Sequence, residues 1–130
     1  MQEKRRVLLQ EREPSLRRVI ELSLLKSGLE ITAVEDHQLA LEQLHGNYDA
    51  YIFEYSPQAL CGSLINQVRS ISTQRACPVV LVTTTNRPGE DWRKTYKPDL
   101  VFYKPFDIRY LERKLLEVLD ERKEGERTIG

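Results

Sequence analysis

The 130-residue sequence lacks several features that would assign it to a common class of protein. It has two cysteines, Cys61 and Cys77, whose spacing matches no metal-ligand motif. No run of about 18 apolar residues occurs, so no segment is expected to span a membrane. The N-terminus also lacks the apolar core of a signal peptide. We therefore expect a cytoplasmic protein in which both cysteines are reduced.

An excess of charge of either sign is also missing. Lys and Arg together number 20 and so do Asp and Glu, giving a formal net charge of zero. This balance argues against binding nucleic acid through a generally basic surface, so we expect no direct nucleic-acid contact. The length fits one domain, and 40% hydrophobic residues suffice for a core.

Catalytic constellations are absent as well. The sequence offers no recognisable Ser/His/Asp or Cys/His arrangement and no glycine-rich phosphate loop. The two histidines, His37 and His45, are isolated near the ends of one helical pattern, where we expect them to be solvated rather than catalytic. The sequence therefore does not predict an enzyme.

Short apolar runs rich in β-branched and aromatic residues recur along the chain. They cover residues 7–9, 31–34, 50–53, 79–82 and 100–103. Continuous apolar runs of this length favour strands that are buried on both faces.

A helical pattern follows each of these runs. The first opens at Pro14 and closes at Gly28, the second follows Asp36 and ends at Gly46, and the last follows Asp107. The apolar positions expected on the buried helical faces are Leu16, Val19, Ile20 and Leu24, then Leu39, Leu41 and Leu44, then Leu64, Ile65, Val68 and Ile71, and finally Ile108, Leu111, Leu115 and Leu119. The fourth helix is expected to be short, because Pro88 and Pro98 bracket it around Trp92.

Strands that alternate with helices predict right-handed crossovers and a parallel sheet covered on both faces. Functional groups of such folds gather at the carboxyl ends of the strands. We place the folded domain at residues 4–119. Residues 120–130 are charged and are predicted to form a C-terminal tail or linker that frays.

Four segments at these strand ends resemble bacterial response-regulator receiver domains. VLLQEREPSLRRVIELSLLKSG is similar to their first strand and helix, and YDAYIFEYSPQALCG to their third strand and phosphoacceptor loop. PVVLVT and KPF are similar to the segments that carry the switch threonine and the lysine–proline pair. The resemblance covers about residues 4–119. It implies a CheY-like, flavodoxin-like α/β fold, a doubly wound five-stranded parallel sheet of order 2-1-3-4-5 with helices on both faces.

The resemblance also implies a role for each pocket position. Glu54 stands where the phospho-accepting aspartate is expected. Glu11 and Arg12 occupy the acidic pair that holds Mg²⁺ in active members of the family. The remaining positions are those of the switch hydroxyl, the aromatic switch and the conserved lysine: Thr83, Val101 and Lys104. Three departures in one pocket, at Glu54, Arg12 and Val101, predict a pseudo-receiver.

Physical chemistry supports this interpretation. Phosphoryl transfer to a carboxylate needs an in-line nucleophile and a cation that absorbs charge. Glu11 and Glu54 carry −2 while Arg12 and Lys104 carry +2, so the pocket is neutral without a metal. We expect the Arg12 guanidinium to pair with Glu54, Glu11 or both, and Mg²⁺ binding to be lost, leaving no cofactor. The extra methylene of Glu54 moves its carboxylate by roughly 1.5 Å, and a misplacement of about 1 Å can slow a reaction about 100-fold.

Three interpretations of this cluster remain open. It is a structural salt-bridge cluster without a signal, or Glu54 partly mimics the phosphorylated state, or the domain no longer switches at this pocket. Mimicry would be incomplete, because a glutamate carries one negative charge against about −1.5 to −2 for a phosphoryl group.

The region from residue 92 to 114 is basic and aromatic, with seven Lys or Arg against three Asp or Glu. In receiver domains the face of the fourth helix, fifth strand and fifth helix commonly carries partner contacts, and aromatic and arginine side chains are typical interface anchors. The residues expected on such a surface are Trp92, Tyr96, Tyr103, Arg109, Tyr110 and Arg113. The alternative is that the aromatic side chains pack inward beneath solvated charges.

The sequence thus predicts a receiver-like signalling domain of a two-component phosphorelay system that acts by protein–protein interaction without phosphorylation. Expected partners are a histidine kinase, an output domain or a second copy of the chain. One alternative is a small-ligand-binding pseudo-receiver, which a dry apolar pocket beside Glu54 would favour. The least favoured alternative is an atypical phosphorylatable response regulator.

Overall fold

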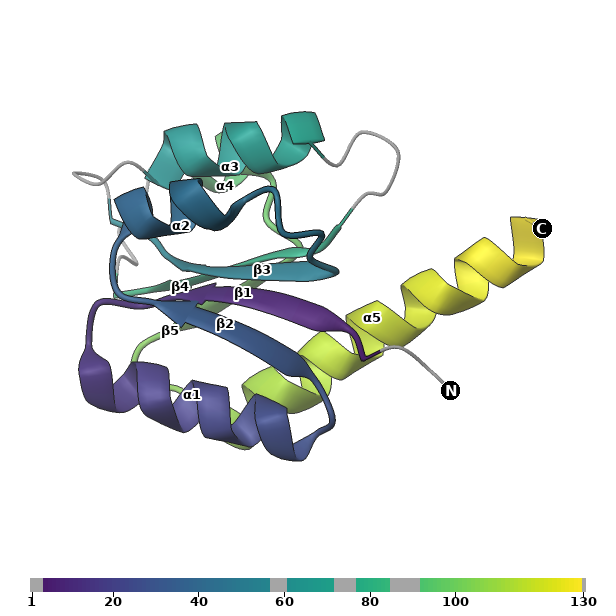
Figure 1. Ribbon diagram of the computed structural model, residues 1–130, viewed down its shortest axis with the longest axis horizontal. Helices are drawn as coiled ribbons and strands as arrows, with labels where there is room; N and C mark the ends of the chain where they lie inside the picture. The colour runs from purple at the N-terminus through teal and green to yellow at the C-terminus, as the bar shows by residue number, and fades with distance from the viewer. Residues whose placement is uncertain (1–3, 57–60, 72–76, 85–91, 130) are drawn as a thin grey trace.

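A computed structural model describes residues 4–56, 61–71, 77–84 and 92–129, with side chains as far as Glu121 (Figure 1). The strands are β1 Arg6–Gln10, β2 Glu30–Val34, β3 Ala50–Glu54, β4 Val79–Thr83 and β5 Leu100–Tyr103. The helices are α1 Pro14–Lys26, α2 His37–Gln43, α3 Cys61–Ile71, α4 Trp92–Tyr96 and α5 Ile108–Ile129. Each predicted strand and helix is therefore confirmed, including the short fourth helix; Pro88, which was expected to bracket it, lies outside the described residues.

The five strands form one parallel sheet of order β2-β1-β3-β4-β5. This is the predicted flavodoxin-like doubly wound topology. Helices α2, α3 and α4 cover one face of the sheet and α1 and α5 the other (Figure 1). Each face has its own apolar cluster, one centred on Tyr51 and Phe53 and the other on Ile52 and Leu111.

Burial differs between the centre and the edges of the sheet. The residues of β4 are all buried, whereas those of the edge strands β2 and β5 are mostly half-buried. The expectation that all five strands are buried on both faces is therefore wrong for β2 and β5. An edge strand has a neighbour on one side only, so part of its surface stays accessible.

Local signals set both ends of α1 and the start of α2 as predicted, whereas α2 ends at Gln43, before the predicted Gly46. Pro14 begins α1, and Gly28 follows its end with a φ of +89°, a value that suits glycine. The Asp36 side chain accepts a hydrogen bond of 2.8 Å from the Leu39 amide and caps α2. Three residues expected on buried helical faces are instead exposed: Val19, Leu39 and Ile71.

Helices α1 and α5 are linked through polar side chains. The hydroxyls of Ser23 and Ser27 donate to the Glu112 carboxylate over 2.6 and 2.5 Å. These bonds hold the pKa of Glu112 below its ordinary value. They also fix the helix that follows the Lys104 loop against the helix that follows Glu11.

Helix α5 continues past the predicted domain boundary to Ile129 and projects beyond the sheet (Figure 1). Residues 120–129 are thus helical, and fraying of this segment stays a prediction. Asp120 itself binds Arg5, with 3.0 Å between Oδ1 and Nη1. Whether residues 120–130 act as a tail or a linker stays a prediction. In the described part of the chain, no helix is long and apolar enough to cross a bilayer.

Candidate functional site

The carboxyl ends of β1, β3, β4 and β5 bring the predicted pocket residues to one edge of the sheet. Glu11 directly follows β1, Glu54 ends β3, Thr83 ends β4 and Lys104 follows β5. In the strand order, β1 is next to β3, and β5 is two strands away beyond β4. The side chains that follow β1 and β5 can therefore approach Glu54 from its two sides. The structure therefore assembles side chains that are up to 93 positions apart in the sequence (104 − 11).

Lys104 is the centre of an ionic cluster with two glutamates. Its Nζ lies 2.8 Å from Glu11 Oε1 and 3.1 Å from Glu54 Oε2. The Glu11 side chain is 1% exposed, while those of Lys104 and Glu54 are 16% and 23% exposed. The contact with Glu54 meets hydrogen-bond geometry, whereas Glu11 Oε1 has no partner that does, so its contact with Lys104 is an ion pair. We call Glu11, Glu54 and Lys104 the ionic cluster.

The other carboxylate oxygens of the ionic cluster accept main-chain hydrogen bonds. Glu54 Oε1 accepts from the Arg12 amide over 3.2 Å, and Glu11 Oε2 accepts from the Glu13 amide over 3.3 Å. All four carboxylate oxygens thus face a donor or a cation from the chain itself.

Arg12 enters this arrangement through its main chain alone. Its side chain is exposed, and among the described residues its guanidinium makes no ion pair with Glu54 or Glu11. The predicted pairing of this guanidinium is therefore wrong. Glu11, Glu54 and Lys104 sum to −1 (−2 + 1) rather than zero.

The two glutamates differ in their affinity for a proton. Burial raises the pKa of Glu11, and the negative charge of Glu54 adds to that rise, against the opposing effect of Lys104. Burial also opposes ionisation of Glu54, but Lys104 and the Arg12 amide outweigh it, so the pKa of Glu54 lies below its ordinary value. Burial would lower the pKa of Lys104, but both glutamates raise it above its ordinary value. The ionic cluster therefore keeps the lysine charged and holds any shared proton on Glu11.

Two side chains hold the main chain of Glu54, and neither was predicted from the sequence. The Glu54 amide donates to Gln10 Oε1 over 3.0 Å, and the Glu54 carbonyl lies 2.8 Å from His37 Nε2, which must donate to it. Gln10 also donates to the Glu35 carbonyl over 3.1 Å. His37 is 6% exposed, so the expectation that it is solvated at a helix end is wrong, whereas His45 is exposed as expected.

A polar residue at the end of a buried strand was the available signal for Gln10. A glutamine that follows Val7, Leu8 and Leu9 has to satisfy its amide group inside the protein. For His37 no comparable local signal exists, because the carbonyl that it contacts is 17 positions away.

The two switch positions have different surroundings. Thr83 is buried, and its hydroxyl donates to the Tyr55 carbonyl over 3.1 Å. Val101 pairs with Leu81 across the sheet and packs against the apolar cluster under α2, α3 and α4. No ring is therefore present at position 101.

The residues predicted for a partner surface divide into two groups. Trp92 is 7% exposed and Tyr96 and Tyr103 are half-buried, as the inward-packing alternative expects. The remaining three residues, Arg109, Tyr110 and Arg113, are exposed. The structure adds Arg93, an exposed residue whose guanidinium lies 5.2 Å from the centre of the Tyr103 ring.

A hollow of about 570 Å³ adjoins the ionic cluster. Its walls come from the start of α1, the end of β4 and the loop after β5. The lining residues are Glu13, Ser15, Leu16, Val19, Thr84, Lys104, Pro105 and Phe106. The apolar part of this lining includes the exposed Val19, and Glu54 does not contribute to it.

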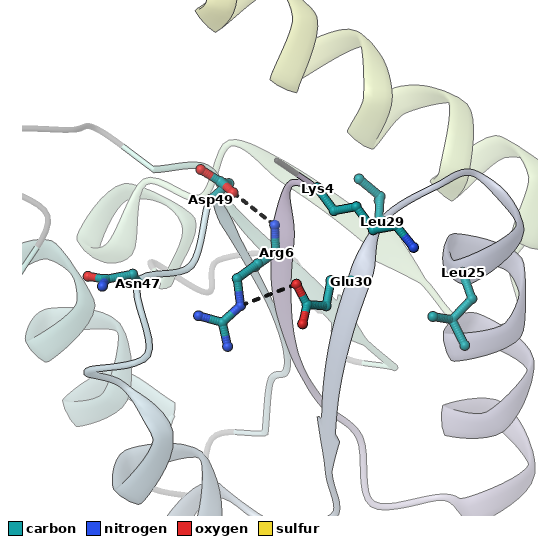
Figure 2. A pocket seen from close by; sticks show the side chains of 7 residues that line it. All are labelled: Lys4, Arg6, Leu25, Leu29, Glu30, Asn47 and Asp49. Atoms are coloured by element: carbon teal, nitrogen blue, oxygen red, sulfur yellow. Dashed lines mark hydrogen bonds and ion pairs between the residues drawn. The ribbon is translucent and has the colours of Figure 1, made fainter. Parts of the chain in front are cut away.

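A larger hollow, of about 910 Å³, lies at the opposite end of the strands and contains none of the predicted site residues (Figure 2). Arg6 lies at its centre: its main-chain amide donates to Asp49 Oδ2 over 2.8 Å, and its side-chain Nε lies 3.8 Å from Glu30 Oε2. The Arg6 guanidinium also donates to the Gly46 carbonyl and lies over the Tyr48 ring. The Arg6 guanidinium is therefore a structural group that joins β1 to β2 and to the loop before β3.

In the described part of the chain, no three His, Cys, Asp or Glu side chains are arranged to hold a metal ion. Cys61 and Cys77 are buried and unpaired. Burial, followed by the charge of Glu54, raises the pKa of the Cys61 thiol to about 12, so it is inert as a nucleophile.

Comparison with known proteins identifies the fold. No protein-family model matches the chain, and no curated protein matches it. Among solved structures, a CheY-like receiver domain protein from Methanospirillum hungatei superposes with a TM-score of 0.83 at 17% identity, covering 95% of this chain and 99% of its own. A sensor protein from Polaromonas gives 0.76 at 27% identity over 92% and 99% of the two chains.

The chemotaxis protein CheY4 of Vibrio cholerae gives a TM-score of 0.76 at 23% identity, covering 89% of this chain and 99% of that protein. The chain therefore has the CheY-like receiver-domain fold over nearly its whole length, as the sequence motifs predict.

Proposed function

We propose that this chain is a receiver-like signalling domain of a two-component system that acts by protein–protein interaction and does not need phosphorylation. One observation carries the proposal: Lys104 contacts both Glu11 and Glu54, within 2.8 and 3.1 Å. The receiver-domain fold supports a place in signalling, and the proposed role is not catalytic. A cytoplasmic location is part of the same proposal.

The residues of this pocket do not fit Mg²⁺, and we propose that its binding is lost. Mg²⁺ takes near-octahedral oxygen coordination and usually needs one or two free carboxylates. Glu54 is bound by Lys104 on one oxygen and by the Arg12 amide on the other. The second residue of the expected acidic pair is Arg12, whose side chain supplies no oxygen ligand.

Glu54 is also poorly placed as a nucleophile. Attack on a phosphoryl group needs a free carboxylate oxygen in line with the leaving group. Both Glu54 oxygens accept hydrogen bonds, and its main chain is held by Gln10 and His37. The carboxylate is therefore fixed in a resting ion pair, which supports a domain with one stable pocket conformation. Beside Lys104, the single negative charge of Glu54 would reproduce only part of the charge of a phosphorylated aspartate, which is about −1.5 to −2.

The partner surface that we propose is formed by α4, β5 and α5. It presents the exposed Arg93, Arg109, Tyr110 and Arg113, and the Tyr110 ring lies 5.3 Å from the Arg113 guanidinium carbon. Exposed tyrosine and arginine side chains are frequent anchors of protein interfaces. A histidine kinase, an output domain or a second copy of the chain fits this role.

Phosphodonor treatment tests the proposal directly. The protein is incubated with acetyl phosphate and Mg²⁺, and its intact mass is measured. The expected result is an unchanged mass, and a stoichiometric gain of one phosphoryl group on Glu54 would refute the proposal.

A double variant supplies the positive control for the proposed loss of Mg²⁺ binding. Arg12→Asp with Glu54→Asp restores two acidic ligands and shortens the acceptor. We expect it to bind Mg²⁺ with a saturable change in Trp92 fluorescence, while the natural protein shows none at millimolar metal. If the natural protein and the double variant respond alike, metal binding was not lost through these residues.

A second candidate function is small-ligand binding in the hollow beside Lys104. Its volume of about 570 Å³ lies within the usual range for ligand pockets, and Leu16, Val19 and Phe106 form an apolar wall. Screening small amphipathic compounds by ligand-observed nuclear magnetic resonance would test it. The Val19→Glu variant should abolish any specific binding, and binding that is unaffected by this change would exclude the hollow.

A further inference from the structure

A stack of two aromatic rings joins the residue after Glu54 to helix α4. The Tyr55 and Trp92 rings lie 4.8 Å apart between centroids with an interplanar angle of 24°. Trp92 is 7% exposed, so this stack is shielded from solvent at its centre. Because Tyr55 is covalently bonded to Glu54, a displacement of Glu54 reaches this ring directly.

Tyr55 is also tied to the end of β4. Its amide donates to the Val82 carbonyl over 2.8 Å, and its carbonyl accepts from the Thr83 hydroxyl over 3.1 Å. These bonds fix the main chain of Tyr55 next to the pocket, while its ring is fixed by α4. A shift of the β3 end therefore cannot occur without changing the stack, the β4 contacts or both.

Trp92 continues these contacts toward the surface. The guanidinium carbon of Arg93 lies 5.7 Å from the Trp92 ring centre and 5.2 Å from that of Tyr103. Arg93 is exposed and Tyr103 is half-buried on β5. The contacts thus run from Glu54 through Tyr55 and Trp92 to the proposed partner surface.

A third ring fixes the position of α4. Tyr96 lies 6.3 Å from Tyr55 between ring centroids, and its hydroxyl occupies the space that a β-carbon at position 62 would fill. Gly62 therefore lets α4 approach α3 closely. With Trp92 against Tyr55 and Tyr96 against Gly62, the short α4 is held at both of its ends.

We infer that Tyr55 and Trp92 couple the ionic cluster to the surface around Arg93 and Tyr103. This inference rests on the proposed function, because it describes how the fixed ionic cluster of an interaction module holds its partner surface in one arrangement. Val101 offers no ring at its position on β5, whereas Tyr55, directly after β3, and Trp92, on α4, supply two stacked rings. Tyr55 is a positioning residue here, since it acts through Trp92 and Arg93.

The experiment uses Trp92 fluorescence, which is specific because the chain has one tryptophan. The Glu54→Gln variant removes the charge that Lys104 and the Arg12 amide hold. We expect this variant to shift the Trp92 emission spectrum and the amide resonances of Arg93 and Lys94. Unchanged emission and unchanged resonances would overturn the inference.

A double-variant comparison then tests the role of the Tyr55 ring. In the Tyr55→Leu background, Glu54→Gln should lose most of its effect on Trp92, and in the Tyr55→Phe background the effect should persist. Tyr110→Leu is the matched control, since Tyr110 contacts Phe102 at 5.8 Å, away from the stack with Trp92. An effect of equal size in the Tyr55→Leu and Tyr110→Leu backgrounds would overturn the inference.

The two proposals can fail separately. The fluorescence measurements contain no phosphodonor. An unchanged Trp92 emission would therefore refute the coupling and leave the proposed phosphorylation-independent function untouched. A phosphorylated Glu54 would refute the proposed function whatever the Tyr55 variants show.

Discussion

Replacing Lys104 with methionine removes a cation that contacts both glutamates of the ionic cluster. The Lys104→Met variant keeps most of the side-chain volume but leaves Glu11, which is 1% exposed, facing Glu54 without a counter-charge. Removing one partner of a buried ion pair costs about 3–5 kcal/mol. Because Lys104 and Glu54 are partly exposed, we expect the smaller loss of about 2–3 kcal/mol in the free energy of unfolding at neutral pH.

The pH dependence of this loss follows from the direction of each pKa shift. The raised pKa of Glu11 makes the folded protein bind this proton more tightly, so its contribution falls as the pH rises through its folded pKa. The lowered pKa of Glu54 gives stability that is present above its unfolded pKa and is lost as the pH falls through its folded pKa. The raised pKa of Lys104 gives stability that is lost only when the pH rises through its folded value.

Without Lys104, both carboxyl groups lose their main counter-charge and both pKa values rise. Protonation then relieves the repulsion, so Lys104→Met should be much closer to the natural protein near pH 4, about the ordinary pKa of a glutamate, than at pH 7. Urea unfolding at both pH values, followed by circular dichroism, measures the difference. The Glu11→Gln/Lys104→Met double variant should regain part of the loss at pH 7, because one of the two facing charges is gone.

A matched control separates this effect from the loss of any surface lysine. Lys114 pairs with Glu117 at 3.4 Å on the exposed side of α5. Lys114→Met should change the free energy of unfolding by less than about 0.5 kcal/mol. If Lys104→Met behaves like Lys114→Met at pH 7, or if its loss is the same at pH 4, the reasoning about the ionic cluster is refuted.

Two further variants test contacts that support the site. His37→Ala removes the donor to the Glu54 carbonyl and opens a cavity, so we expect a loss of about 2–3 kcal/mol in urea unfolding, whereas His45→Ala should stay within about 0.5 kcal/mol. A small effect of His37→Ala would mean that the carbonyl finds another donor. Gly62→Ala places a β-carbon against the Tyr96 hydroxyl and should lower the melting temperature, and Tyr96→Phe in the same chain should recover part of that loss. No recovery would show that the clash lies with another group.

The fold could be predicted because its signals are local and repeated. Each apolar run became a strand, and the Asp36 cap and Gly28 lie where the sequence places the helix boundaries. Parallel order followed from the alternation of strands and helices. Burial at the edges was not predictable from the same runs, because an apolar residue does not reveal how many neighbouring strands it has.

The sequence predicted which residues meet at the strand ends, but it predicted only part of their contacts. The meeting of Glu11, Glu54 and Lys104 follows from the convergence of strand ends. The direction of the Arg12 side chain does not, because a long flexible side chain in a loop can point to solvent at little cost. The partners of Gln10 and His37 were missed for another reason. Gln10 lies 44 positions and His37 17 positions before Glu54, and no periodicity in the sequence indicates contacts over such separations.

The exposed guanidinium of Arg12 changes the physical reason for the proposed loss of Mg²⁺ binding. With that group in the cluster the charges would cancel, and a cation at the metal position would repel Mg²⁺. Without it the cluster keeps a charge of −1, so charge alone does not oppose a cation. Under the proposed loss, the opposing factor is the commitment of every carboxylate oxygen to Lys104 or to a main-chain amide. Shortening Glu54 would break its contact with Lys104, whereas Arg12→Asp alone would leave that contact in place. We therefore expect Mg²⁺ binding only when both changes are made.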